Sequence, residues 1–305
     1  MNTTATTYQD ASAAGWLAYG KAYAELTKIK ISVMVLFTFC VAGVLAAGMS
    51  VNLLTLFYAT VGMLLIASSG NAMNMYLERY TDYLMPRTSG RPLPAQKLSA
   101  TEVVIFAAVC FGVSVGIFLT LVNWQTALCG IATWILYVCI YTPLKTRTAL
   151  NTEVGAIPGA MPILMGALAT TGTIDFVSFA FFCVLLIWQF PHFMSIAWLY
   201  RDQYRKGGLK MITVTDPTGK SAGRKAVVLC VLMIAVSLLP AFAFATVIHS
   251  VLFSMAAVLL AWPYMKASIQ FARQRTDVTA RRLLKSSVLY LPMYMLIVVI
   301  GRLSS

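Results

Sequence analysis

Charged residues are scarce in this chain. Only 11% of its 305 residues are Asp, Glu, Lys or Arg, whereas soluble domains carry about 25%. So few charges cannot cover the surface of a water-soluble domain of this length, and that class is excluded. A composition that is 59% hydrophobic also excludes a disordered chain and a coiled coil. The composition is typical of a helical protein that crosses a membrane several times.

The cysteines and the N-terminus exclude further classes. The six cysteines contain no C-x-x-C pair and all lie in apolar segments, so we expect small buried side chains rather than disulfides or zinc ligands. Residues 1–15 lack the basic start and apolar core of a cleaved signal peptide. We expect residues 1–27 to form a mobile cytoplasmic segment, followed by one domain over residues 28–305.

Nine apolar segments are long enough to span a bilayer, which takes about 20 largely apolar residues in a helix. They are Ile31–Met49, Val51–Tyr76, Val103–Val122, Trp124–Leu144, Val154–Thr171, Phe176–Tyr200, Ala226–Ile248, Val251–Ala267 and Leu283–Gly301. The sequence therefore predicts an all-α polytopic membrane protein with nine transmembrane helices.

Basic residues are distributed unevenly between the two sides of this predicted bundle. With the N-terminus inside, 22 of the 23 Lys and Arg residues fall in inside segments, and only Arg302 falls outside. The positive-inside rule then predicts a cytoplasmic N-terminus and an outside C-terminus. The net charge of +13 is therefore explained by topology, and no nucleic-acid partner is expected.

The first of two long inside loops, residues 77–101, carries a pattern of polar residues. Asn74, Glu78 and Asp82 are spaced four apart, and four residues along a helix turn the side chain by only about 40°. Their oxygen atoms would line one face and suit Mg²⁺. Arg87 and Arg91 follow and can clamp phosphate oxygens. We interpret the pattern as a diphosphate site; the alternative is a solvated helix end with weak surface ion pairs.

The second long inside loop, residues 201–225, repeats part of this pattern. Asp202 leaves the sixth apolar segment much as Asn74 leaves the second, and one acid can hold a second metal ion. Lys206 and Lys210 follow and can bind phosphate as point charges. An ordinary cluster of inside lysines is the alternative. At the end of the fourth segment, Lys145 and Arg147 either complete a ring of phosphate donors or only anchor the topology.

Together these motifs resemble the UbiA-type intramembrane prenyltransferases, a family with nine helices. The resemblance covers roughly residues 28–301 and rests on Asn74-x3-Glu78-x3-Asp82, on Arg87-Thr-x-x-Arg91-Pro-Leu, on Tyr200-Arg-Asp202-x-Tyr204 with Lys210-Met, on Tyr141-Thr with Lys145, and on Gln189-Phe-Pro-His192-Phe. Singly these motifs are weak signals, and together they are specific. Within the family the chain looks like the branch that farnesylates heme.

The resemblance implies a reaction and a set of site residues. It implies transfer of farnesyl from farnesyl diphosphate to a vinyl group of heme b, giving heme o, with magnesium. We expect Asn74, Glu78, Asp82 and Asp202 to bind the metal and act in catalysis, and Arg87, Arg91, Lys145, Arg147, His192, Tyr204, Lys206 and Lys210 to bind substrate. The wider family shows a second pair of acids, whereas Lys206 stands four residues after Asp202 here. Lys206 is therefore expected to supply part of the positive charge that a second metal ion would otherwise provide.

His192 has two interpretations. It lies inside the sixth segment after Pro191, and imidazole is costly in lipid unless it faces the bundle interior. Neutral imidazole is a common axial ligand of heme iron, so heme contact is one interpretation, and the resemblance favours it. A hydrogen bond to backbone freed by Pro191 is the other.

The expected setting is a bacterial plasma (inner) membrane, because nothing resembles an organelle transit peptide. Expected partners are membrane lipid and a downstream heme-modifying enzyme or heme-copper oxidase. Two other functions remain open at this stage. One is prenylation of another acceptor, such as a quinone precursor. The other is secondary transport, which the clustering of acids at one membrane face disfavours, since transporters usually carry such groups at the midplane.

Overall fold

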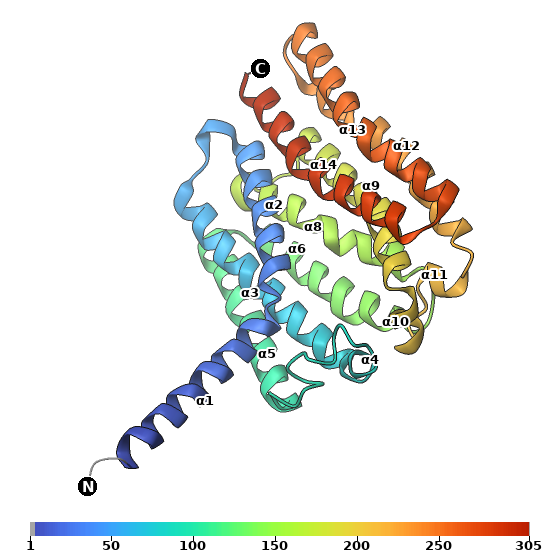
Figure 1. The fold of residues 1–305 in the computed structure, drawn as a ribbon. Coiled ribbons are helices and arrows are strands. Elements are labelled where there is room, and N and C mark those ends of the chain that lie inside the picture. Colours follow the sequence, from blue (N-terminus) through green and yellow to red (C-terminus); the bar gives the residue numbers. More distant parts are fainter. Residues whose placement is uncertain (1–3, 305) are drawn as a thin grey trace.

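The computed structural model describes the backbone of residues 4–304 and the side chains of residues 15–302, and every regular element in that part is helical (Figure 1). The elements are α1 (Thr4–Leu26), α2 (Ile29–Ala47), η1 (Gly48–Ser50), α3 (Leu53–Leu77), α4 (Arg79–Tyr83), α5 (Ala100–Ile117), η2 (Phe118–Val122), α6 (Trp124–Ile135), η3 (Leu136–Tyr141), α7 (Thr142–Leu144), α8 (Asn151–Thr171), α9 (Phe176–Leu199), α10 (Arg201–Lys206), α11 (Ile212–Thr215), α12 (Lys220–Ser237), η4 (Leu239–Ala243), α13 (Val247–Gln274) and α14 (Asp277–Ser304).

Nine helical stretches in the described part are long and apolar enough to cross a membrane. They are Ile29–Ser50, Leu53–Leu77, Ala100–Val122, Trp124–Leu144, Asn151–Thr171, Phe176–Leu199, Lys220–Ala243, Val247–Gln274 and Asp277–Arg302. The prediction of an all-α polytopic protein with nine spans is therefore confirmed. Several helices extend past the predicted apolar segments; α14, for example, begins at Asp277 rather than Leu283, because helical hydrogen bonds continue through charged turns that can reach the membrane interface.

The N-terminal segment contains a helix that the sequence analysis does not predict. Helix α1 runs from Thr4 to Leu26 and projects from the bundle (Figure 1). Near its end Ala22 and Leu26 are buried, and the Tyr19 hydroxyl donates to a carboxylate oxygen of Glu102 in α5. The predicted mobility of residues 1–27 stays a prediction, and residues 1–3 lie outside the described residues.

Polar caps fix where several spans begin. The Asn52 side chain accepts hydrogen bonds from two backbone N–H groups of the first turn of α3. Ser99 and Glu102 form a reciprocal capping box at the start of α5, and the Asp175 carboxylate caps α9. Each cap satisfies donors that the first turn of a helix leaves unpaired. The caps therefore stabilise the helix ends at points where an apolar sequence alone would not define them.

Small residues let the central helices approach closely. A Cβ atom on Gly166 of α8 would lie 2.2 Å from the backbone oxygen of Phe39 in α2, so only glycine fits at this crossing. Gly43 of α2 faces the same contact, with the Gly166 oxygen 3.1 Å from its ideal Cβ position. Close approach through small residues is the usual way that transmembrane helices gain packing energy.

The short helices α4, α10 and α11 gather at one end of the bundle, and the C-terminus lies at the other end (Figure 1). Met85, Tyr204 and Leu209 form a small apolar cluster at that first end. The two long loops of the sequence therefore meet in space. The cysteines are all free, as expected, but only Cys110 and Cys230 are buried. Cys40, Cys129 and Cys183 are partly buried and Cys139 is exposed, so the expectation that all six are buried is wrong for these four.

Candidate active site

The predicted polar stripe lies where α3 passes into α4. The backbone N–H of Glu78 donates to the Asn74 carbonyl at 2.9 Å, and that of Asp82 donates to the Glu78 carbonyl at 2.7 Å. Helical spacing is therefore kept across the junction, so the three side chains remain four residues apart on one face. Asn74 and Asp82 are buried, each with 1% of its surface exposed. The stripe points into protein rather than into solvent.

Each member of the stripe meets a cation from elsewhere in the chain. Nη1 of Arg91 lies 2.6 Å from Oδ2 of Asp82, and Nζ of Lys145 lies 2.7 Å from Oε1 of Glu78. The side chains of Lys145 and Glu78 are only 16% and 11% exposed. The alternative interpretation, a solvated helix end with weak surface ion pairs, does not fit these contacts. Both pairs are largely shielded from water and salt, which screen exposed charges much more strongly.

Lys28 supplies a third cation, which the sequence analysis does not include among the site residues. Its Nζ donates to Oδ1 of Asn74 at 2.7 Å, while the Asn74 amide donates to the hydroxyl of Thr142 at 3.2 Å. Lys28 sits in a left-handed backbone conformation, φ 49°, at the break between α1 and α2. From sequence it differs in no way from a lysine that anchors the end of a span, and no motif marks it.

Burial and charge together shift the ionisation of this cluster. Burial, with repulsion from Arg91 and Lys145, lowers the pKa of Lys28 to about 7. Burial opposes the ionisation of Glu78, but Lys145 and the other cations hold the pKa of that carboxyl below its ordinary value. Burial raises the pKa of Asp82 above its ordinary value, outweighing the attraction of Arg91. Perturbed ionisation of this kind is common at functional sites.

Lys145 stays charged in this cluster. Burial favours the neutral amine, yet the Glu78 carboxylate raises the pKa of Lys145 above its ordinary value. Its Nζ also lies 4.7 Å from the centre of the Tyr141 ring, which adds a cation–π contact. Lys145 contacts the acidic stripe directly. This contact favours a role in the site over a role as a topology anchor alone.

The second loop reaches the same place through aromatic contacts. The Arg87 guanidinium lies 4.4 Å from the Tyr200 ring centre and 5.7 Å from that of Tyr204. The Arg87 backbone N–H donates to Oε1 of Gln203 at 3.3 Å. The backbone N–H of Lys210 donates to the Lys145 carbonyl at 2.7 Å. The structure therefore brings together the three segments that the sequence analysis treated separately.

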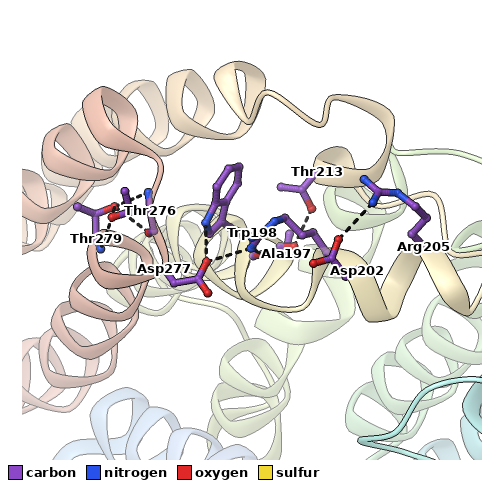
Figure 2. Close-up of polar contacts among 9 residues, drawn as sticks. Ala197, Trp198, Asp202, Arg205, Thr213, Thr276, Asp277 and Thr279 are labelled. Atoms are coloured by element: carbon purple, nitrogen blue, oxygen red, sulfur yellow. Dashed lines mark hydrogen bonds and ion pairs between the residues drawn. The ribbon is translucent and has the colours of Figure 1, made fainter.

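Other predicted residues lie outside this cluster. Asp202 is 68% exposed in its side chain and pairs with Arg205 of its own helix at 3.2 Å; Figure 2 shows the carboxylate turned toward that arginine. Lys206, Lys210 and Arg147 are exposed. Within the described residues, no three His, Cys, Asp or Glu side chains come close enough to hold a metal ion. The predicted four-ligand set, with Asp202 as a member, is therefore not assembled here.

The acids of the stripe nevertheless suit a divalent cation. Oδ1 of Asp82 is buried and has no hydrogen-bond partner, which is costly for a carboxylate oxygen. Glu78, Asp82 and the Asn74 amide together offer the oxygen donors that magnesium prefers. The unpaired oxygen is the atom that a bound cation would satisfy.

His192 lies away from the acidic stripe, in α9 against α14. Its Nδ1 is 2.8 Å from the hydroxyl oxygen of Ser287, and its ring stacks on Trp188 with centres 4.9 Å apart. One interpretation of His192 is a hydrogen bond to backbone groups freed by Pro191. In the structure its Nδ1 hydrogen-bonds to the Ser287 hydroxyl instead. Nearby, the Trp198 indole donates to Asp277 (Figure 2). The Arg201 guanidinium donates to the same carboxylate, so α9 and the start of α10 are both tied to the start of α14.

The sequence is similar to a known family and to individual members of it. The sequence matches the UbiA prenyltransferase family over residues 35–294. A protoheme IX farnesyltransferase of Rhodopirellula baltica is 38% identical over 90% of this chain and 97% of its own length. One from Solibacter usitatus is 41% identical over 80% of this chain and 82% of its own length.

Solved structures share the fold at low sequence identity. A digeranylgeranylglyceryl phosphate synthase is 16% identical and superposes with a TM-score of 0.77 over 94% of this chain and 99% of its own. A UbiA homologue from Archaeoglobus fulgidus, bound to DMAPP and Mg²⁺, is 14% identical, with a TM-score of 0.63 over 88% and 99%. The nine-span fold and the match across most of the sequence agree with the resemblance seen in the motifs. The chain belongs to the UbiA prenyltransferase family.

Proposed function

We propose that this protein transfers the farnesyl group of farnesyl diphosphate to a vinyl group of heme b, giving heme o and diphosphate. The observation that carries the proposal is the 38% identity to a protoheme IX farnesyltransferase across 97% of that relative's length. The cluster of partly buried cations beside the acidic stripe supports it, because a diphosphate needs such a site. His192, deeper in the bundle, supports the choice of heme as acceptor.

The departure of diphosphate gives these partly buried cations a role. When the bond between farnesyl C1 and oxygen breaks, both electrons leave with diphosphate, and negative charge builds on its oxygens. Lys28, Arg91 and Lys145 surround the stripe and would stabilise that charge as it develops. Arg87, whose guanidinium lies over the Tyr200 ring and near that of Tyr204, adds a planar donor for phosphate oxygens.

The allylic cation must be kept from bulk water until the acceptor attacks it. The allylic cation left on farnesyl is attacked by the terminal carbon of the vinyl group, which forms the new carbon–carbon bond. Water then adds to the resulting benzylic-type cation and releases a proton, which leaves a hydroxyl on the product. The isoprenoid chain is apolar and belongs among the helices, so the bundle keeps bulk water from the first cation.

Magnesium is proposed as the metal. Asn74, Glu78 and Asp82 would hold it, and the unpaired Oδ1 of Asp82 supports that assignment. When bound, the ion would supply charge neutralisation on the diphosphate oxygens. Asp202 stays a proposed ligand for a second ion, and Lys206 and Lys210 stay proposed phosphate contacts at the mouth of the site, with Arg147 beside them.

The proposed setting is a bacterial inner membrane with the active site facing the cytoplasm. The distribution of 22 of 23 basic residues supports a cytoplasmic N-terminus and an outside C-terminus. Heme o would then pass to a heme-modifying enzyme or a heme-copper oxidase in the same membrane. Reporter fusions at each terminus test the topology, and co-purification from membranes tests the partner.

One experiment tests the reaction and its main rival, prenylation of a quinone precursor. Purified protein in detergent is given farnesyl diphosphate, Mg²⁺ and either heme b or 4-hydroxybenzoate, and the products are identified by mass. We expect farnesylated, hydrated heme only, and none from Glu78→Gln under the same conditions. Prenylated hydroxybenzoate without heme o would overturn the proposed acceptor.

A further inference from the structure

The hydrogen bond between His192 and Ser287 determines where the imidazole carries its proton. A serine hydroxyl has one proton to donate and two lone pairs to accept with. The Ser287 hydroxyl donates to the Leu284 carbonyl of its own helix at 2.7 Å. It also lies 2.8 Å from Nδ1 of His192. Both contacts are satisfied only if Nδ1 carries a hydrogen and donates it to Ser287. Nε2 is then unprotonated, and its lone pair has no hydrogen-bond partner among the described residues.

The surroundings fix the plane of the ring as well as its proton. The His192 ring stacks on the Trp188 indole at 23° between planes, and the edge of Phe193 lies against it at 5.6 Å between centres. The Trp188 indole N–H donates to the backbone carbonyl of Ser287 at 2.9 Å. Ser287 therefore anchors both the imidazole, through its hydroxyl, and the ring on which the imidazole stacks.

The hydrogen bond between His192 and Ser287 is not needed to join α9 to α14. The bond from Trp188 to the Ser287 carbonyl already ties α9 to α14. Ser287 has 0% of its surface exposed, while His192 is only partly buried. An imidazole whose Nδ1–H is held by a neighbour and whose Nε2 is free is the form that binds metals.

We infer that Ser287 is a positioning residue for the heme substrate: by accepting the Nδ1–H of His192, it presents Nε2 to the heme iron as an axial ligand. The inference rests on the proposed function for the identity of the ligand. A hydroxyl acceptor raises the basicity of imidazole less than a carboxylate does. The resulting bond to iron is moderate, which suits a heme that must leave as product.

The test is a heme titration that does not depend on turnover. Purified protein is titrated with ferric heme b and followed by absorbance and electron paramagnetic resonance. We expect a spectrum with a nitrogen axial ligand, which His192→Ala loses and added imidazole restores. Ser287→Ala should bind heme 10- to 100-fold more weakly with an altered spectrum, and Ser287→Thr, which keeps the hydroxyl, should resemble the unmodified protein.

The matched control is Ser268→Ala in α13, whose hydroxyl is equally buried and donates to the Tyr264 carbonyl of its own helix. It should leave heme affinity and spectrum unchanged. If Ser287→Ala does not insert, Ser287→Cys, of similar volume but a poor acceptor, takes its place. An unchanged spectrum in a folded Ser287 variant, or the same loss in Ser268→Ala, would overturn the inference.

The two proposals fail differently in these experiments. If the unmodified protein makes heme o while its heme complex shows no nitrogen ligand, the positioning role is wrong and the reaction stands. If it makes no heme o but binds heme through His192 in the way described, the reaction is wrong and the positioning role stands.

Discussion

The ammonium of Lys28 lies 2.7 Å from Oδ1 of Asn74, 46 positions later in the chain. The contact joins the break before α2 to the last turns of α3. It places a partly buried lysine beside the acidic stripe, where Glu78 and Asp82 already pair with Lys145 and Arg91. Three cations from separate segments thus surround one stripe of oxygen atoms.

Lys28→Ala should weaken binding of farnesyl diphosphate by at least about tenfold, because a charge-assisted contact to an anion contributes roughly 1.5–3 kcal/mol. Heme binding should be retained, since His192 lies elsewhere in the bundle. The measurement is titration with a non-hydrolysable farnesyl diphosphate analogue. Lys30→Ala, an exposed lysine two residues away, is the control. Equal affinities in the two variants would remove Lys28 from the site.

Glu78→Gln should abolish turnover while the protein still inserts and folds. The change removes a proposed metal ligand and the partner of Lys145, so several kcal/mol of charge stabilisation, and hence orders of magnitude in rate, should be lost. The rate of diphosphate release is measured across a series of Mg²⁺ concentrations, with chelator as the zero point. Glu25→Gln, whose carboxylate is 36% exposed in a pair with Lys97, should retain activity. Near-normal release by Glu78→Gln would contradict the metal site.

Arg91→Ala should destabilise the fold as well as the site. It leaves the 1%-exposed Asp82 carboxylate without its partner, and breaking a buried pair from one side costs about 3–5 kcal/mol. Arg91→Ala combined with Asp82→Asn should regain part of the stability but none of the activity. Thermal unfolding in detergent measures both.

The control for Arg91 is Arg205→Ala, which breaks an exposed pair with Asp202 and should cost under about 1 kcal/mol. If Arg205→Ala and Arg91→Ala destabilise the protein equally, the pair with Asp82 is not a buried one in solution.

Gly166→Ala should prevent the close approach of α2 and α8. The added Cβ would lie 2.2 Å from a backbone oxygen of Phe39, and a backbone atom cannot move aside without shifting the helix. We expect a large fall in unfolding temperature and in yield from membranes. Gly112→Ala in α5 adds a Cβ with nothing within 4 Å and should be neutral or slightly stabilising. Similar behaviour of both variants would contradict the crossing.

Much of the fold follows from the sequence alone. The nine spans are predicted because hydropathy and helix length are local properties, and the bilayer sets the length. The stripe of Asn74, Glu78 and Asp82 is predicted for the same reason, since helical spacing fixes which residues share a face. The ends of the spans are less well predicted, because charged turns such as the start of α14 remain helical.

Tertiary structure alone decides the pairing of these side chains. Lys28 and Lys145 look like ordinary end-of-span lysines in the sequence, and only packing brings them to the stripe. Asp202 matches part of the motif, yet its carboxylate is exposed beside Arg205. Ser287 has no sequence signal at all, and its role comes from the 2.8 Å contact with His192. Contacts between distant residues depend on how the helices cross, which no local pattern specifies.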